Sequence, residues 1–271
     1  MGKYFQVATT SWQRAMVYRW NSLLEVWGYL LTMSISVLMW RFVFEKTGKE
    51  SIAGYTASEM TSYLLIAGYL ASALWFTAQG NRISNEIKDG VISNYLVRPL
   101  SIMGYYHVYG VIGKLSQIMM STVSFGIVLV ALHFWGGISL PISLHASSFI
   151  GFILFFLLAI MIQFMIFYNA GLFAFWLDEA SGIAFLVRVF ADVAAGAFLP
   201  LSLFSEQWQG FFNLLPFRYM ISIPANVLLG RLTTLEMVKT AAGALIWLAV
   251  LYGLALIMMR RGIRHYSAVG R

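Results

Sequence analysis

Six long apolar runs, separated by short polar segments, dominate the pattern of the chain. A membrane-spanning helix needs about 20 predominantly apolar residues, and each run approaches or exceeds that length. The sequence therefore predicts an all-α integral membrane protein with about six transmembrane helices, forming a single transmembrane domain over residues 1–271. The predicted spans lie at about 26–44, 63–78, 115–135, 149–177, 183–204 and 240–259.

Residues 4–20 precede the first span and have the pattern of an amphipathic helix. Phe5, Trp12 and Trp20 fall on one face at helical spacing, whereas Gln13 falls on the opposite face. Tryptophan and a basic polar face are typical of helices that lie in a membrane interface. We expect an N-terminal interfacial helix here, with packing on other protein as the alternative.

The region between the fifth and sixth spans has a different pattern. Pro200 interrupts the fifth apolar run, and two further apolar pieces follow at 208–215 and 219–229. Each piece is too short to cross a bilayer core about 30 Å thick. The sequence predicts a re-entrant or surface-lying hairpin over residues 205–230.

The polar segment 81–99 connects the second and third spans, and it has a helical pattern of its own. Its apolar positions recur at roughly helical spacing, its charged residues lie between them, and a proline stops the run. We expect a short helix that docks on a cytosolic partner, with a solvated loop whose apolar side lies on the membrane surface as the alternative. The charged residues are Glu86, Lys88, Asp89 and Arg98, and the proline is Pro99.

Composition and charge strengthen the membrane assignment and set the orientation. Apolar residues make up 60% of the chain, charged residues 11%, and the mean hydropathy is +0.76. The net charge of +7 comes from Lys and Arg scattered between the apolar runs, which does not favour a nucleic-acid surface. With both termini cytoplasmic, the inner segments hold 12 Lys and Arg and the outer segments hold 6, as the positive-inside rule requires.

Few ionisable or amide side chains fall inside the predicted spans. Arg188 and Asp192 lie four residues apart in the fifth span, so they share one helix face and can pair. They form either a self-compensating structural pair or the polar lining of a substrate path, where they could also bond to a partner helix. Gln163 and Asn169 in the fourth span are weaker candidates for the same roles, because amides also join neighbouring membrane helices.

No catalytic or nucleotide-binding motif accompanies these residues. A phosphate-binding loop GxxxxGK[ST] has only a partial match at Gly113-Lys114-Leu115-Ser116, where the first glycine and the final hydroxyl residue are both missing. We therefore expect a non-catalytic subunit, with ATP hydrolysis on a separate chain. Cysteine is absent and the four His lie far apart, so we expect no metal site.

The 81–99 segment also carries a family resemblance. It contains E-x-x-x-G at Glu86 and Gly90, followed by L-x-x-P-L-S with Leu96, Pro99 and Leu100. This arrangement, together with the interfacial helix, the six spans and the proline-punctuated segment before the last span, resembles the permease subunits of type-2 ABC transporters. The resemblance covers nearly the whole chain.

The resemblance implies a transporter of two permeases, of the same or related chains, and two ATPase subunits in a bacterial inner membrane. The 81–99 helix would press into each ATPase, which would bind ATP and Mg²⁺, and this chain would hold no cofactor. The resemblance also implies export of a substrate that passes between the two permeases. The aromatic-rich, weakly charged spans favour an amphipathic substrate, and these spans would also contact membrane lipids. The implied ATPase-coupling residues are Glu86, Asp89, Gly90, Arg98 and Pro99.

Two other classes of protein compete with this interpretation. A self-sufficient secondary transporter or channel would be expected to show repeated halves or broken helices around an ion site, and the sequence has no visible internal repeat. A membrane enzyme acting on lipids would need a His, carboxylate or Ser constellation, and none is visible. A stably bound ATPase would distinguish the ABC permease from both.

Overall fold

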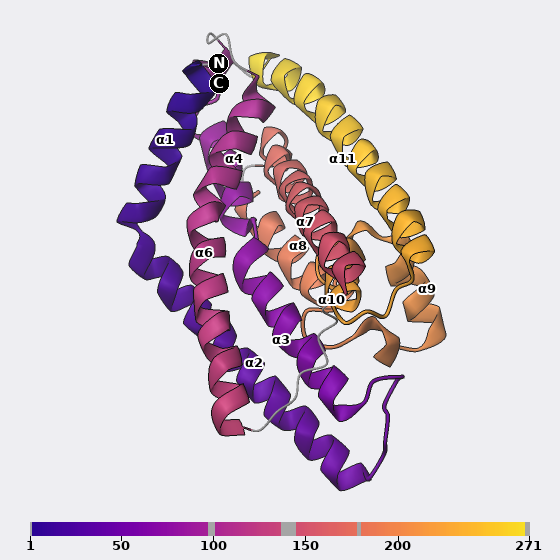
Figure 1. The fold of residues 1–271 in the computed structure, drawn as a ribbon. Helices are drawn as coiled ribbons and strands as arrows, with labels where there is room; N and C mark the ends of the chain where they lie inside the picture. Colours follow the sequence, from indigo (N-terminus) through magenta and orange to yellow (C-terminus); the bar gives the residue numbers. More distant parts are fainter. Residues whose placement is uncertain (1, 97–100, 137–144, 178–179, 269–271) are drawn as a thin grey trace.

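The computed structural model describes residues 2–96, 101–136, 145–177 and 180–268. These residues form a bundle of helices, and no strand occurs among them. The start of α1 and the end of α11 lie at the same end of the bundle, with the α2–α3 connection at the opposite end (Figure 1). A chain whose two ends lie at the same end of the bundle runs along the bundle an even number of times.

Five helical segments in the described part of the chain are long and apolar enough to cross a membrane. They contain five of the six predicted spans, and α3 continues through a short break into α4, as α7 continues into the 3-10 turn η1. Their bounds are α2 Arg19–Thr47, α3 Ala57–Leu74 with α4 Thr77–Lys88, α6 Ile102–Gly136, α7 Ala146–Leu172 with η1 Phe173–Phe175, and α11 Thr234–Ala268.

The predicted fifth span differs from the structure. Helix α8, Ser181–Ala194, has 14 residues and a length of about 21 Å, less than the hydrocarbon core of a bilayer. The helix ends before Pro200 because Gly196 adopts a left-handed φ of +78° and the Tyr63 hydroxyl donates to the Gly196 carbonyl at 2.8 Å. The rest of the predicted span, to Phe204, is irregular chain and the 3-10 turn η2, Leu201–Leu203.

Two short helices occupy the region of the predicted hairpin. Helix α9, Glu206–Leu214, leaves Trp208 and Leu214 more than half exposed. After the 3-10 turn η3, Pro216–Tyr219, helix α10 is mostly buried against α3 and α7. The hairpin thus has one exposed limb and one buried limb, and α10 spans Ser222–Leu228.

Helix α1, Gly2–Val17, runs alongside the first turns of α6. The Ser11 hydroxyl donates to the Tyr109 carbonyl at 2.6 Å, and the Tyr4 hydroxyl lies beside Gly104. The two helices are therefore parallel, and packing on other protein accounts for part of the amphipathic pattern. Phe5 remains 74% exposed, so the other face of α1 stays available to a membrane interface.

Two glycines bring the backbones of α4 and α7 into direct contact. A Cβ on Gly80 would lie 2.9 Å from the Phe167 carbonyl oxygen, and a Cβ on Gly171 would lie 2.7 Å from the Gly80 carbonyl oxygen. Real Cβ atoms do not come so close to a backbone oxygen, so only glycine fits at either position. Helix α4 is consequently held against the core of the bundle and is not a free loop.

A polar contact, which we name the clasp, joins the α2–α3 connection to the chain around α10. The Tyr55 hydroxyl donates to Asn226 Oδ1 at 2.6 Å, while Arg231 donates to the Gly54 carbonyl at 3.0 Å and lies over the Tyr55 ring at 3.8 Å. Burial raises the pKa of the Tyr55 hydroxyl, so it keeps the proton that it donates. The clasp consists of Gly54, Tyr55, Asn226 and Arg231.

Candidate functional site

A polar cavity of about 670 Å³ lies among α1, α2, α4, α6 and α8. It is an unusual feature for a bundle of this hydropathy, because its walls carry four basic and two acidic side chains. Buried charge is costly, so a cluster of charged side chains in a cavity is a candidate functional region. The charged lining residues are Arg14, Arg82, Lys114, Arg188, Glu25 and Glu86.

Lys114 on α6 lies at one end of a short hydrogen-bonded chain in this cavity. Its ammonium group donates to the side-chain oxygen of Gln117, one helical turn further on. The Gln117 amide nitrogen in turn donates to Glu25 Oε2 at 3.1 Å and to the Ser72 carbonyl at 2.9 Å. Gln117 therefore joins α6 to α2 and α3, and it places a neutral amide between Lys114 and Glu25.

Arg188 and Asp192 form the predicted pair. Arg188 Nε lies 2.9 Å from Asp192 Oδ2, and both side chains are more than four-fifths buried. The guanidinium also donates to the Tyr29 hydroxyl and lies 3.9 Å from the centre of the Trp75 ring. The i, i+4 prediction is confirmed, and the pair is further fixed to α2 and to the end of α3.

A smaller cavity of about 150 Å³ continues from this pair between α2, α3 and α8. Arg188 lines both cavities, so it stands where the two adjoin. Hydroxyl groups of Thr32 and Ser36 contribute to the smaller cavity. The result is a polar seam along one side of the bundle.

Glu86 takes part in a second ion pair, at the end of α4. Its Oε1 lies 2.5 Å from Arg82 Nε, and its Oε2 accepts a hydrogen bond of 2.6 Å from the Tyr106 hydroxyl on α6. Arg82 also donates to the Tyr105 hydroxyl and lies 3.6 Å above the Tyr109 ring. The carboxylate expected to face an ATPase is instead occupied inside this chain.

The 81–99 segment differs from the expected single helix. Its first part belongs to α4, which ends at Lys88, and a separate short helix α5, Ser93–Leu96, follows after Gly90. Gly90 has a φ of +78°, and a Cβ there would lie 3.2 Å from the Tyr266 hydroxyl of α11. Gly90 therefore forms the turn between α4 and α5.

The segment is nevertheless amphipathic in the way that its sequence predicts. Ile83, Ile87 and Ile92 are almost completely buried in the core. The polar face stays exposed, and Asp89 belongs to it, whereas the predicted coupling residues Arg98 and Pro99 lie outside the described residues. The exposed polar positions, which we name the docking face, are Asn85, Lys88, Asp89, Ser93 and Asn94.

Gln163 is not brought together with Arg188 and Asp192. It is completely buried on α7, and its side-chain nitrogen and oxygen both lack a hydrogen-bond partner. It lines neither of the polar cavities. Asn169, on the same helix, donates to the Leu251 carbonyl at 3.1 Å and thus joins α7 to α11, as an interhelical amide does.

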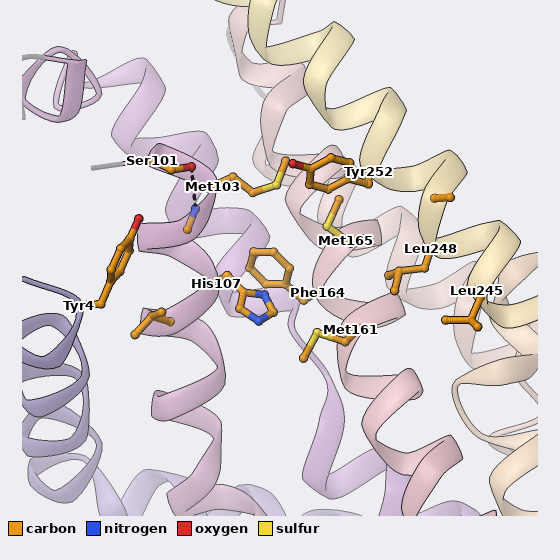
Figure 2. A pocket seen from close by; sticks show the side chains of 13 residues that line it. Tyr4, Ser101, Met103, His107, Met161, Phe164, Met165, Leu245, Leu248 and Tyr252 are labelled. Atoms are coloured by element: carbon orange, nitrogen blue, oxygen red, sulfur yellow. Dashed lines mark hydrogen bonds between the residues drawn. The ribbon is translucent and has the colours of Figure 1, made fainter. Parts of the chain in front are cut away.

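An apolar pocket of about 670 Å³ lies on the other side of α6, between α6, α7 and α11. Figure 2 shows Phe164 beside His107 on one side and Leu248 on the other, with Met161 and Met165 between them. His107 stands edge-on against the Phe164 ring, with centroids 4.7 Å apart. This pocket offers apolar contact with a single imidazole, in contrast to the charged cavity.

Sequence reasoning assigned no site role to Lys114, and it did not identify the tyrosines. Tyr105, Tyr106 and Tyr109 surround the Arg82–Glu86 pair. The available signal was their clustering just after the 81–99 segment. In the part of the chain that the structure describes, no group of three His, Cys, Asp or Glu residues is placed to hold a metal ion.

The described helices and the cavity define a multi-pass helical membrane protein with charged side chains gathered among its helices. The chain matches the family described as "ABC-2 family transporter protein" over residues 30–270, and it belongs to that family. It is thus a membrane component of an ABC transporter, and membership implies partnership with an ABC ATPase. No match to the chain is found among curated proteins.

Proposed function

We propose that this chain is the non-catalytic permease subunit of an ATP-driven exporter in a bacterial inner membrane, with both termini in the cytoplasm. Two such permeases, identical or related, associate with two ATPase subunits, which bind ATP and Mg²⁺. An amphipathic substrate passes along the polar seam between the permeases. The observation that carries the proposal is the docking face, a polar surface on a segment anchored in the bundle.

The anchoring explains how such a surface transmits force. The buried isoleucines hold the segment to the core, and the Gly80–Gly171 contact fixes α4 to α7. Arg82 lines the polar cavity and binds Glu86, so the same short helix connects the docking face with the cavity. A rigid helix that contacts two sites can carry energetic coupling between them.

Charge reversal on the docking face tests the proposal. Asp89→Lys and Lys88→Glu change exposed side chains, so the permease should remain folded. We expect severalfold less ATPase to co-purify with each variant, because a rim charge that faces a complementary surface becomes repulsive. Glu206→Lys, an exposed reversal on α9, is the matched control and should retain the ATPase.

The alternatives give different outcomes. A secondary transporter or channel would transport without any ATPase, and reversal at Asp89 would not change its activity. Normal ATPase association and normal coupled hydrolysis in both docking-face variants would contradict the proposal.

A further inference from the structure

We propose that the polar cavity binds the anionic group of an amphiphile, with Lys114 as its central cation. The inference rests on the proposed function only for the source of the ligand. The chemical class of the ligand follows from the charges of the cavity and from the way in which they are paired.

The balance of charge in the cavity favours an anion. Four basic side chains line it against two carboxylates. Asp192, which lies outside the lining of this cavity, pairs with Arg188, and even with Asp192 included the basic groups remain in excess by one. A cationic ligand would enter against this field, whereas a phosphate, sulfate or carboxylate would be attracted by it.

The ion pairs show which basic side chains make up the excess of positive charge. Arg82 has Glu86 at 2.5 Å and Arg188 has Asp192 at 2.9 Å. Among the described residues, neither Lys114 nor Arg14 has a carboxylate within ion-pair distance, and Lys114 is held by the neutral amide of Gln117. A cation removed from water needs a counter-charge, and Glu25 reaches Lys114 only through the Gln117 amide, so a bound anion would add a direct counter-charge.

The environment of Lys114 suits the binding of a ligand's head group, because the ammonium group is held in one position. The ammonium lies 5.8 Å from the centre of the Phe76 ring and is fixed by Gln117, so its position is preorganised. The cavity volume of about 670 Å³ lies within the range of small-molecule sites. Arg14, at the exposed rim, would meet the anion as it enters.

An amphiphile also has a place for its apolar part. Glu25 at the cavity rim belongs to α2, and its neighbours Leu24 and Trp27 are 71% and 55% exposed on the outer surface of that helix. A chain that follows these side chains stays in the hydrocarbon of the bilayer while its head group lies in the cavity. The cavity therefore fits an anionic amphiphile better than a free anion.

The test measures binding of dodecyl phosphate to the purified permease in nanodiscs of phosphatidylcholine, with dodecyltrimethylammonium as the cationic control. We expect the permease to prefer the phosphate. Lys114→Gln should weaken that binding about tenfold, the equivalent of one charge-assisted hydrogen bond, while Lys114→Arg should retain most of it. Lys239→Gln, an equal loss of charge at an exposed position on α11, should have no effect.

A second variant guards against a folding defect at Lys114. Arg14 is exposed and lies at the cavity rim, so Arg14→Gln should fold normally and still weaken dodecyl phosphate binding severalfold. Equal affinity for both amphiphiles, or unchanged affinity in both Lys114→Gln and Arg14→Gln, would overturn the proposal.

Two further arms distinguish a transported anion from a resident lipid. Stimulation of ATP hydrolysis by dodecyl phosphate in the permease–ATPase complex assigns the anion to the substrate. Retention of phosphatidylglycerol by the wild type but not by Lys114→Gln, without stimulation, assigns it to the bilayer. Binding is measured without the ATPase, so failure of the docking-face experiment would leave this result standing, and the reverse also holds.

Discussion

At the scale of single residues, substitutions of Arg188 and Asp192 should have coupled effects on stability. Removing either partner leaves the other charge buried, a penalty of about 3–5 kcal/mol in soluble proteins and less in membranes. The single variants Asp192→Asn and Arg188→Gln should therefore lower thermal stability in detergent more than the double variant does. Asp89→Asn, the same substitution at an exposed site, is the control. If all the variants unfold at the same temperature as the wild type, the pair is solvated.

Gly80 gives a second prediction at the residue scale. A Cβ at this position would meet the Phe167 carbonyl oxygen at 2.9 Å, so Gly80→Ala should push α4 away from α7 and cost about 1–3 kcal/mol. Gly210→Ala, on α9 where nothing lies within 4 Å, should be neutral or slightly stabilising. Thermal unfolding of the two variants makes the comparison. Equal stability would mean that α4 is not held by this contact.

Sequence spacing predicts some of these residue contacts and not others. The Arg188–Asp192 pair lies within one helix, where a spacing of four fixes the geometry. Glu86 also has an i, i+4 partner, but Tyr106 reaches it from the next helix, so only packing decides that this carboxylate faces inward. The link from Lys114 through Gln117 to Glu25 also depends on packing, because Glu25 lies on another helix, α2.

At the scale of elements, the ion pair at the end of α4 should transmit movement and not bind the ATPase. Tyr106→Phe removes the hydroxyl that links Glu86 to α6, and Glu86→Gln removes the carboxylate charge and leaves one acceptor oxygen for the two donors, Arg82 and Tyr106. We expect both variants to keep the ATPase but to lose substrate-stimulated hydrolysis, whereas Asp89→Lys should lose the ATPase itself. Co-purification and hydrolysis assays on the same preparations separate the two effects. Loss of ATPase binding in Glu86→Gln would place Glu86 on the docking surface instead.

Periodicity predicts elements well where one pattern persists. The long apolar runs in α2, α6, α7 and α11 predict their helices because hydrophobic length alone determines a membrane span. The early end of α8 is not visible in that pattern, since it depends on the backbone of Gly196 and its contact with Tyr63, residues far apart in the sequence. The pattern also does not determine where α4 ends, because a single glycine such as Gly90 can lie within or beyond a helix.

At the scale of the whole molecule, the orientation remains a prediction from charge. Single cysteines test it directly, because the chain contains none of its own. We expect a membrane-impermeant thiol reagent to label Lys49→Cys and Gln207→Cys in intact cells, and to label Asn85→Cys only after lysis. All three positions are exposed in the structure. Labelling of Asn85→Cys from outside would reverse the assignment.

The clasp fixes one end of the α2–α3 hairpin to the rest of the bundle. It ties the α2–α3 hairpin to the chain around α10 at the end of the bundle opposite to the chain termini (Figure 1). When a body turns about a fixed end, displacement grows with distance from that end. A small tilt of the hairpin would thus leave the Tyr55–Asn226 hydrogen bond intact. Glu25 lies near the end of α2 that is farther from the clasp. We expect a tilt about the clasp to move the α2 wall of the cavity, where Glu25 lies, more than the parts of α2 nearer to the clasp.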